Sequence, residues 1–360
     1  MEIGVYTFGD LGTHPITKQT ISPHQRMLNL MEEIALADEL GLDVFAVGEH
    51  HRPDYLISSP TVVLGAAAVK TKKIKLSTAV TVLSSDDPVR VFQQFAEIDL
   101  LSGGRAEIMA GRGSFIESFP LFGYQLEDYD ELFSEKLEML LKLTEEEIFS
   151  WKGKHTQTII RRGVYPRPLQ KKLPVWIGVG GTPESVVRAA EHGLPMALAI
   201  IGGIPARFKP FVQLYKDVYA KAGHNTTKLQ LGINSHTFIA DESQAARDDF
   251  YPPYSSVMNR IGEERGWPPG TREQFDGSTD LNGALLVGSP QEVIDKILYQ
   301  HELFGHTRFL AQMSLGAMPH DKVLHSMELL ATKVAPAVKK YTSVEAGQTS
   351  HIGQIGQRGE

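Results

Sequence analysis

The sequence predicts an α/β fold, a (β/α)8 TIM barrel with long loop insertions at its C-terminal face. Strand-like and helix-like stretches alternate along the chain, which is typical of a parallel sheet. The strand stretches are short and almost continuously apolar, as expected for strands buried on both faces. The chain has 360 residues, and because a plain barrel takes roughly 250, one barrel with long loops accounts for the length. An open doubly wound sheet is the alternative architecture.

The first half of the barrel is predicted from four apolar stretches, at residues 3–8, 42–47, 74–83 and 107–110. Helices separate them. Ser22-Pro23 and Asp87-Pro88 each supply an N-cap followed by a first helical residue, and a further helix begins near Pro60. Gly41 and Gly103 end the first and third of these helices, because glycine adopts the left-handed conformation that closes a helix.

The second half repeats the pattern, with strands predicted at residues 175–179, 196–201, 229–240 and 308–313. Helices are predicted at residues 183–192, 206–221 and 321–335, and the strand count reaches eight. Residues 1–340 are therefore assigned to a single domain, with residues 341–360, rich in Gly, Gln and Ser, as a flexible tail.

Three segments are longer than ordinary connections, at residues 113–129, 150–173 and 250–289. The third, an insertion of the barrel domain, contains Arg260, Trp267 and Arg272 among other large side chains. A lid over the barrel and a solvated excursion explain this segment equally well.

The composition excludes several classes of protein. The net charge of −7 disfavours a nucleic-acid partner, which would need a basic surface. The chain has no cysteine, so disulfides, thiolate zinc sites and cysteine nucleophiles are excluded. The N-terminal residues do not resemble a signal peptide, and no apolar run is long enough to span a membrane. We therefore expect a cytoplasmic protein.

The first candidate site is Gly48-Glu49-His50-His51, at the carboxyl end of the second predicted strand. Active sites of barrels lie at that end, and a histidine there can transfer protons near neutral pH. Adjacent histidines point in different directions, so we expect at most one of His50 and His51 to face a ligand. A structural histidine is the alternative. We expect no metal, because the cluster lacks a helical pair of ligands.

The second and third candidate sites are Arg112, between two glycines after the fourth strand, and Gly181-Thr182-Pro183 after the fifth. An arginine fork matches a phosphate, and the free amides of a helix N-terminus attract an anion. Together the two sites could hold one phosphate from opposite sides, although each could also be a plain turn. In the third strand, the small residues Ser77 to Ala79 could admit a flat ring, or simply pack the barrel.

Taken together, these segments resemble the bacterial luciferase-like family of flavin-dependent monooxygenases. The resemblance runs from residue 3 to about residue 340. It is carried by the order and spacing of several stretches, at residues 41–51, 78–90, 101–113, 175–178, 189–195 and 287–292.

The resemblance implies that reduced FMN binds at the carboxyl ends of the strands. Arg112 matches the arginine that binds the FMN phosphate. The other matching positions are backbone donors to the phosphate at Gly181 and Thr182, a hydroxyl donor at Ser185, a cis peptide bond under the flavin at Ala79-Val80, a histidine near the reactive face of the ring at His50, and a position beside the ring at Ile200.

The implied activity is oxygen transfer from dioxygen to an unidentified small organic substrate, through a flavin hydroperoxide. No nicotinamide-binding motif is visible, so a separate flavin reductase would supply reduced FMN. Light emission is not expected, because Gly111 replaces the cysteine of the luciferases and Ile200 replaces their aromatic residue. The family also implies a homodimer, with the helices at residues 60–70 and 88–101 as candidate faces.

Three alternatives remain open. The first is a deazaflavin-dependent oxidoreductase on the same fold, which would transfer hydride and ignore dioxygen. The second is a flavin-binding protein without catalysis, although His50 at a strand end weighs against it. The third is a barrel aldolase or isomerase, which would need a lysine or paired carboxylates that are not evident at the strand ends.

Overall fold

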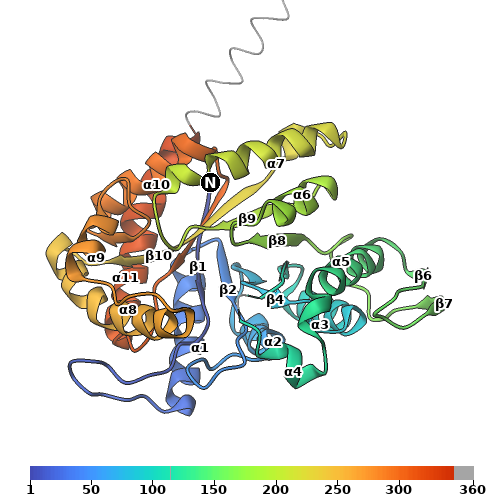
Figure 1. Cartoon of the computed structure of the whole chain (residues 1–360), viewed down its shortest axis with the longest axis horizontal. Coiled ribbons are helices and arrows are strands. Elements are labelled where there is room, and N and C mark those ends of the chain that lie inside the picture. The colour runs from blue at the N-terminus through green and yellow to red at the C-terminus, as the bar shows by residue number, and fades with distance from the viewer. Residues whose placement is uncertain (114, 344–360) are drawn as a thin grey trace, which may run out of the picture.

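Nine parallel strands follow one another around a nearly closed barrel with helices outside it (Figure 1). The structure is a computed structural model, and it describes residues 1–113 and 115–343. Around the barrel the strands are β3 (Lys75–Thr78), β2 (Val44–Val47), β1 (Glu2–Thr7), β12 (Arg308–Gln312), β10 (Leu231–Ile239), β9 (Met196–Ala199), β8 (Val175–Val179), β5 (Ile108–Gly111) and β4 (Thr81–Val82).

The barrel has eight strand positions, because β3 and β4 are two halves of one predicted strand. Only Ala79 and Val80 separate them in the sequence. A parallel bridge between Leu76 and Ala106 joins this strand position to β5 and completes the circuit. The predicted barrel is therefore confirmed, and the open doubly wound sheet is wrong.

The helices were predicted best where capping residues mark their ends. Ser22 accepts a hydrogen bond from the Gln25 amide, and Asp87 accepts from Val89 and Arg90. The helices are α1 (Pro23–Glu39), α2 (Pro60–Lys70), α3 (Pro88–Ser102), α4 (Ser118–Phe122), α5 (Tyr129–Glu145), α6 (Pro183–Glu191), α7 (Lys209–Lys221), α8 (Ser243–Arg265), α9 (Arg272–Thr279), α10 (Pro290–Phe304) and α11 (His320–Leu329).

Two apolar layers explain the continuous apolar runs in the strands. In β2, Phe45 and Val47 belong to a large cluster that also contains side chains of the surrounding helices. Val44 and Ala46 belong to a smaller cluster inside the barrel, with Met109. Successive side chains of a strand point to opposite faces, so each strand serves both layers.

The three long segments contain more regular structure than predicted. Residues 150–173 include the outer strand of an antiparallel hairpin formed by β6 (Ile148–Trp151) and β7 (Ile159–Gly163). This hairpin projects at one edge of the molecule (Figure 1). Residues 113–129 contain the short helix α4.

The insertion at residues 250–289 is mainly helical, so its prediction as a long loop was wrong. Helix α8 continues through Pro252 and Pro253, and α9 and the short strand β11 (Leu286–Gly288) follow it before α10 begins. Phe250 of α8 stacks on Phe238 of β10 with ring centroids 5.6 Å apart. This packing offsets the helix-breaking tendency of the prolines, which misled the sequence prediction.

At the C-terminus, the last helical stretch continues to residue 343, three residues into the predicted flexible tail. The rest of that predicted tail lies outside the described residues. Among residues 1–113 and 115–343, no helix is long and apolar enough to cross a membrane.

Candidate active site

The predicted site residues gather at the carboxyl ends of the barrel strands. His50 follows β2, Val80 lies between β3 and β4, Arg112 follows β5, and Thr182 follows β8. Because all these strands are parallel, their carboxyl ends share one rim of the barrel. The structure therefore places the first three candidate sites on one face of the molecule.

The break between β3 and β4 places Val80 over the barrel interior. The peptide bond between Ala79 and Val80 is cis, at the position that the family resemblance implies. A Cβ atom at Gly111 would lie 2.5 Å from Val80 Cγ2, and one at Gly178 would lie 2.7 Å from Val80 Cγ1. These two glycines therefore make the space that the Val80 side chain occupies.

The two predicted halves of the phosphate site are in direct contact. Arg112 Nη2 donates a hydrogen bond of 2.8 Å to Thr182 Oγ1, which in turn donates to Ser185 Oγ at 2.8 Å. Arg112 Nη1 donates to Asp130 Oδ1 at 2.5 Å. Gly181 has a φ of +119°, a conformation in which a side chain would be strained. This conformation turns the chain into α6, which begins at Pro183, and the positive end of the helix dipole favours an anion there.

The sequence analysis missed a second arginine at this site. Arg188 lies on α6, three residues after Ser185, and its Nη1 atom is buried without a hydrogen-bond partner among the described residues. Burial and the positive charge of Arg112 lower the pKa of Arg188. Two neighbouring guanidinium groups, one of them unsatisfied, favour an anion between them. The i, i+3 spacing from Ser185 was the available signal in the sequence.

His50 lies in an aromatic pocket at the same rim. Its ring centroid is 4.4 Å from that of Phe8, 4.5 Å from that of Tyr55 and 4.8 Å from that of Phe115. Burial, reinforced by the charges of Arg52 and His51, lowers the pKa of His50 to about 3. The imidazole is therefore neutral at physiological pH, with one nitrogen to donate a hydrogen bond and one to accept.

His51 has a different environment, as predicted for adjacent histidines. Its Nε2 lies 3.3 Å from Glu49 Oε1, and its ring meets that of Phe122 edge-on at 5.3 Å. The two imidazoles thus contact separate groups, and the aromatic pocket belongs to His50.

Ile200 follows β9 at the same rim, but its side chain packs outside the barrel strands. It is fully buried in the large cluster between the barrel and its helices, together with Leu198. The residue between them, Ala199, is partly exposed. The place of Ile200 beside a flavin ring stays a prediction from the family resemblance. Side chains alternate along β9, and the sequence did not show which residue of this pair faces inward.

An ionic cluster attaches the insertion to the rim near His50. Arg52, after β2, donates hydrogen bonds to Glu117 and to Glu264 of α8, and its guanidinium carbon lies 4.5 Å from the centre of the Phe115 ring. Arg260 of α8 pairs with Asp54 at 2.5 Å. The C-terminal half of α8 therefore covers the side of the rim where the aromatic pocket lies.

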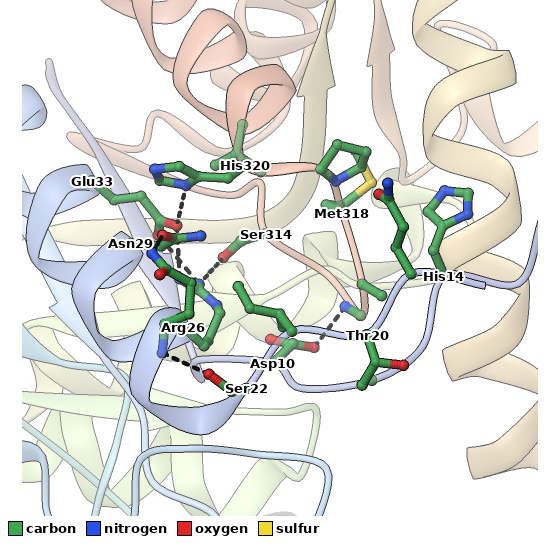
Figure 2. Close-up of a pocket in the computed structure, with 18 residues that line it drawn as sticks. Asp10, His14, Thr20, Ser22, Arg26, Asn29, Glu33, Ser314, Met318 and His320 are labelled. Carbon is green, nitrogen blue, oxygen red and sulfur yellow. Dashed lines mark hydrogen bonds and ion pairs between the residues drawn. The ribbon is translucent and has the colours of Figure 1, made fainter. Parts of the chain in front are cut away.

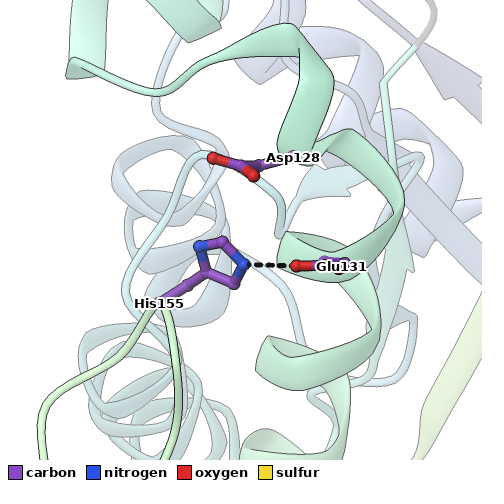
Figure 3. A group of neighbouring side chains, drawn as sticks. All are labelled: Asp128, Glu131 and His155. Carbon is purple, nitrogen blue, oxygen red and sulfur yellow. Dashed lines mark hydrogen bonds and ion pairs between the residues drawn. The ribbon is translucent and has the colours of Figure 1, made fainter.

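One surface group has the composition of a metal site. Ligand atoms of Asp128, Glu131 and His155 lie within 4.8 Å of one another (Figure 3). Glu131 already accepts hydrogen bonds from His155 Nε2 and from Lys154. An ordinary surface ion pair explains this group.

These observations define a class of protein: a TIM barrel with two neighbouring arginines and a neutral histidine at the carboxyl ends of its strands. The family model of the luciferase-like monooxygenases matches residues 1–307. The chain therefore belongs to the luciferase-like monooxygenase family and is an oxidoreductase, as the sequence predicted.

Curated relatives support this assignment. The chain is 26% identical over 356 residues to the 4-hydroxyprotoasukamycin monooxygenase of Streptomyces nodosus subsp. asukaensis, covering 92% of each chain. It is 24% identical over 342 residues to the alkanal monooxygenase alpha chain of Photobacterium leiognathi, covering 88% of this chain and 95% of the relative.

Solved structures share the fold at low identity. The monooxygenase RslO1 from Streptomyces bottropensis matches with a TM-score of 0.79 and 24% identity, over 93% of this chain and 99% of that one. The oxygenating constituent of 3,6-diketocamphane monooxygenase from Pseudomonas putida, solved with FMN, has a TM-score of 0.74 and 20% identity, over 94% and 98%. An F420-dependent secondary alcohol dehydrogenase has a TM-score of 0.73 and 17% identity, over 94% and 98%.

Proposed function

We propose that this chain is an FMN-dependent monooxygenase that uses reduced FMN and dioxygen to oxygenate a small organic substrate. The observation that carries the proposal is the pair of arginines beside the start of α6. Arg112 already donates a hydrogen bond to Thr182, and Arg188 Nη1 is buried without a hydrogen-bond partner in the part of the chain that the structure describes. A terminal phosphate is a group that both arginines could bind, beside the positive end of the α6 dipole.

The residues at this rim fit the phosphate and the ring system of FMN. Arg112, Arg188, Ser185 and the amides of Gly181 and Thr182 would hold the phosphate of FMN. Val80, supported by glycines over the barrel interior, would lie beneath the ring system. Bound reduced flavin supplies two electrons to dioxygen, of which one oxygen atom enters the substrate and the other leaves as water.

His50 would act beside the ring. Its neutral imidazole can accept a proton at one nitrogen while it donates a hydrogen bond from the other. Phe8, Tyr55 and Phe115 surround it and exclude water from its faces. This pocket favours a catalytic role for His50 over a purely structural one, because none of the described residues forms a hydrogen bond with its ring nitrogens, whereas Glu49 contacts the ring of His51.

The second candidate function is hydride transfer with a deazaflavin. It is favoured by one observation, the similarity of the barrel to the F420-dependent secondary alcohol dehydrogenase. The two functions differ in their response to dioxygen, which only the FMN enzyme would consume. A flavin-binding protein without catalysis would bind FMN but would transfer no oxygen to a substrate.

We also propose two protein contacts. A separate flavin reductase would supply reduced FMN, as predicted from the sequence. A homodimer would bury the apolar side chains exposed on α2 and α3, where Val62 is 72% exposed, Val69 70% and Leu101 55%. A cytoplasmic location stays a prediction from the sequence.

Titration of the full chain with FMN, riboflavin and a deazaflavin, followed by dioxygen uptake with each reduced cofactor, tests the proposal. We expect FMN to bind more tightly than riboflavin and to support dioxygen uptake. Tight binding of the deazaflavin without dioxygen uptake would favour the second candidate. Weak binding of all three would contradict both.

A further inference from the structure

A cavity of about 660 Å³ opens at the rim beside the ends of β1 and β12 (Figure 2). Its walls come from the segment after β1, the first half of α1, and the segment that leads from β12 into α11. Polar side chains from all three segments point into it, including Asp10, Asn29 and Ser314 (Figure 2). The volume is in the range of pockets that hold small organic molecules.

The cavity lies across the barrel mouth from the proposed phosphate site. Between β1 and β5 the circuit contains β2 and the β3–β4 position, and between β12 and β8 it contains β10 and β9. A cofactor anchored at β5 and β8 therefore leaves the β1–β12 side of the rim free.

The wall of the cavity adjoins the His50 pocket through Asp10. Asp10 forms an antiparallel bridge with Tyr55, whose ring centroid lies 4.5 Å from that of His50. Tyr55 thus stands between the cavity wall and the histidine that we place beside the flavin ring.

The charges in the cavity wall are almost all compensated within the wall. Arg26 Nη1 donates to Glu33 Oε1 at 2.8 Å, and Nη2 donates to Ser314 at 3.3 Å. His320 Nδ1 lies 3.5 Å from the same Glu33 oxygen. A charged ligand would have to break these buried pairs, which is costly.

Asp10 is the exception. Its side chain is buried, and Oδ1 accepts a hydrogen bond of 2.9 Å from the Gly316 amide, but Oδ2 has no partner among the described residues. Burial raises the pKa of Asp10 to about 7, against the opposing effects of the Gly316 amide and Arg26. A buried carboxylate oxygen without a partner is costly unless a ligand donates a hydrogen bond to it.

We propose that this cavity binds the organic substrate, and that the substrate is a neutral molecule with a hydroxyl group that donates a hydrogen bond to Asp10. The assignment as a substrate pocket rests on the proposed monooxygenase function. We infer a neutral substrate because the other charged side chains of the wall are already paired with one another. We infer a hydroxyl group because Asp10 Oδ2 has no hydrogen-bond partner among the described residues. An anionic substrate is disfavoured because the uncompensated group in the wall is itself acidic.

Three probes of the same shape test the proposal: cyclohexanol, methoxycyclohexane and cyclohexanecarboxylate. Binding is followed by the NMR signal of methyl-labelled Met318, which lines the cavity and is assigned with Met318→Leu. We expect cyclohexanol to shift this signal and to bind at least tenfold more tightly than the ether, which has no donor, and than the anion. Asp10→Asn should weaken cyclohexanol binding by about ten- to a hundredfold, as for the loss of a hydrogen bond to a charged group.

The matched control is Asp241→Asn, which removes an exposed carboxylate that pairs with His325 on another part of the surface. It should leave cyclohexanol binding unchanged. Equal binding of all probes, absence of any Met318 shift up to the solubility limit of cyclohexanol, or full binding by Asp10→Asn would overturn the proposal. FMN titration of the same samples is scored separately. Failure to bind FMN would overturn the substrate role even if cyclohexanol binds.

Discussion

Removal of the Arg112 guanidinium should weaken FMN binding and leave riboflavin binding almost unchanged. Arg112 has one donor on Thr182 and one on Asp130, whose side chain is 69% exposed. A phosphate can replace Asp130 at little cost, since an exposed ion pair contributes at most about 1 kcal/mol. The charge-assisted bonds to phosphate contribute about 1.5–3 kcal/mol, so Arg112→Ala should reduce FMN affinity by about ten- to a hundredfold.

Fluorescence titration of the flavin measures this effect directly. Arg112→Lys should recover only part of the affinity, because lysine keeps the charge but loses the two parallel donors. Asp130→Asn is the matched control. It removes the competitor for Arg112, so FMN affinity should stay the same or increase. If riboflavin affinity falls as much as FMN affinity in Arg112→Ala, the arginine supports the fold and the phosphate assignment is refuted.

Four further predictions follow from the same geometry. Arg188→Gln should weaken FMN binding by about tenfold with no matching loss for riboflavin in parallel titrations, since it removes a charged hydrogen bond to the phosphate. Gly111→Ala should destabilise the fold by about 1–3 kcal/mol, because the new Cβ would lie 2.5 Å from Val80 Cγ2, and Val80→Ala should relieve part of the loss in calorimetry. His50→Ala should lower kcat by about 10²–10⁴-fold with little change in FMN affinity, and an unchanged kcat would leave His50 a structural role. The pKa of His50 falls from 6.5 to about 3 on folding, so the unfolded chain binds a proton first and the folded protein loses stability as pH falls from 6.5 towards 3. In denaturant titrations over this pH range, the stability of His50→Gln should therefore be less sensitive to acid.

The barrel was predictable because its signals are local. Ser22, Asp87 and Gly103 mark helix ends in the sequence, and the structure shows the predicted caps at all three. The apolar runs of the strands follow from burial on two faces, which any parallel barrel imposes. The insertion was not predictable in the same way. Helix α8 contains two prolines and is maintained by contacts such as Phe250 on Phe238, which no local pattern shows.

The candidate site shows the same difference between residues that local sequence signals predict and residues whose role depends on packing. Arg112 and Thr182 were predicted because each follows a strand or begins a helix, and parallel strands bring such residues to one rim. Ser185, which accepts a hydrogen bond from Thr182, came from the family resemblance. Arg188 was missed because its importance lies in an unsatisfied donor, which depends on the packing of α6. Asp10 was missed for a similar reason, since nothing in the sequence shows that the Gly316 amide would reach only one of its two oxygens.

Anaerobic loading of the full chain with reduced FMN, followed by mixing with dioxygen, tests the central claim most directly. We expect the loaded protein to consume one equivalent of dioxygen as its FMN is oxidised. The rate of this oxidation should differ from that of free reduced FMN. Without substrate, both oxygen atoms should leave as hydrogen peroxide. Two results together would contradict the proposed FMN-dependent activity: reoxidation of the bound FMN at the rate of free FMN, and tight binding of a reduced deazaflavin that does not react with dioxygen.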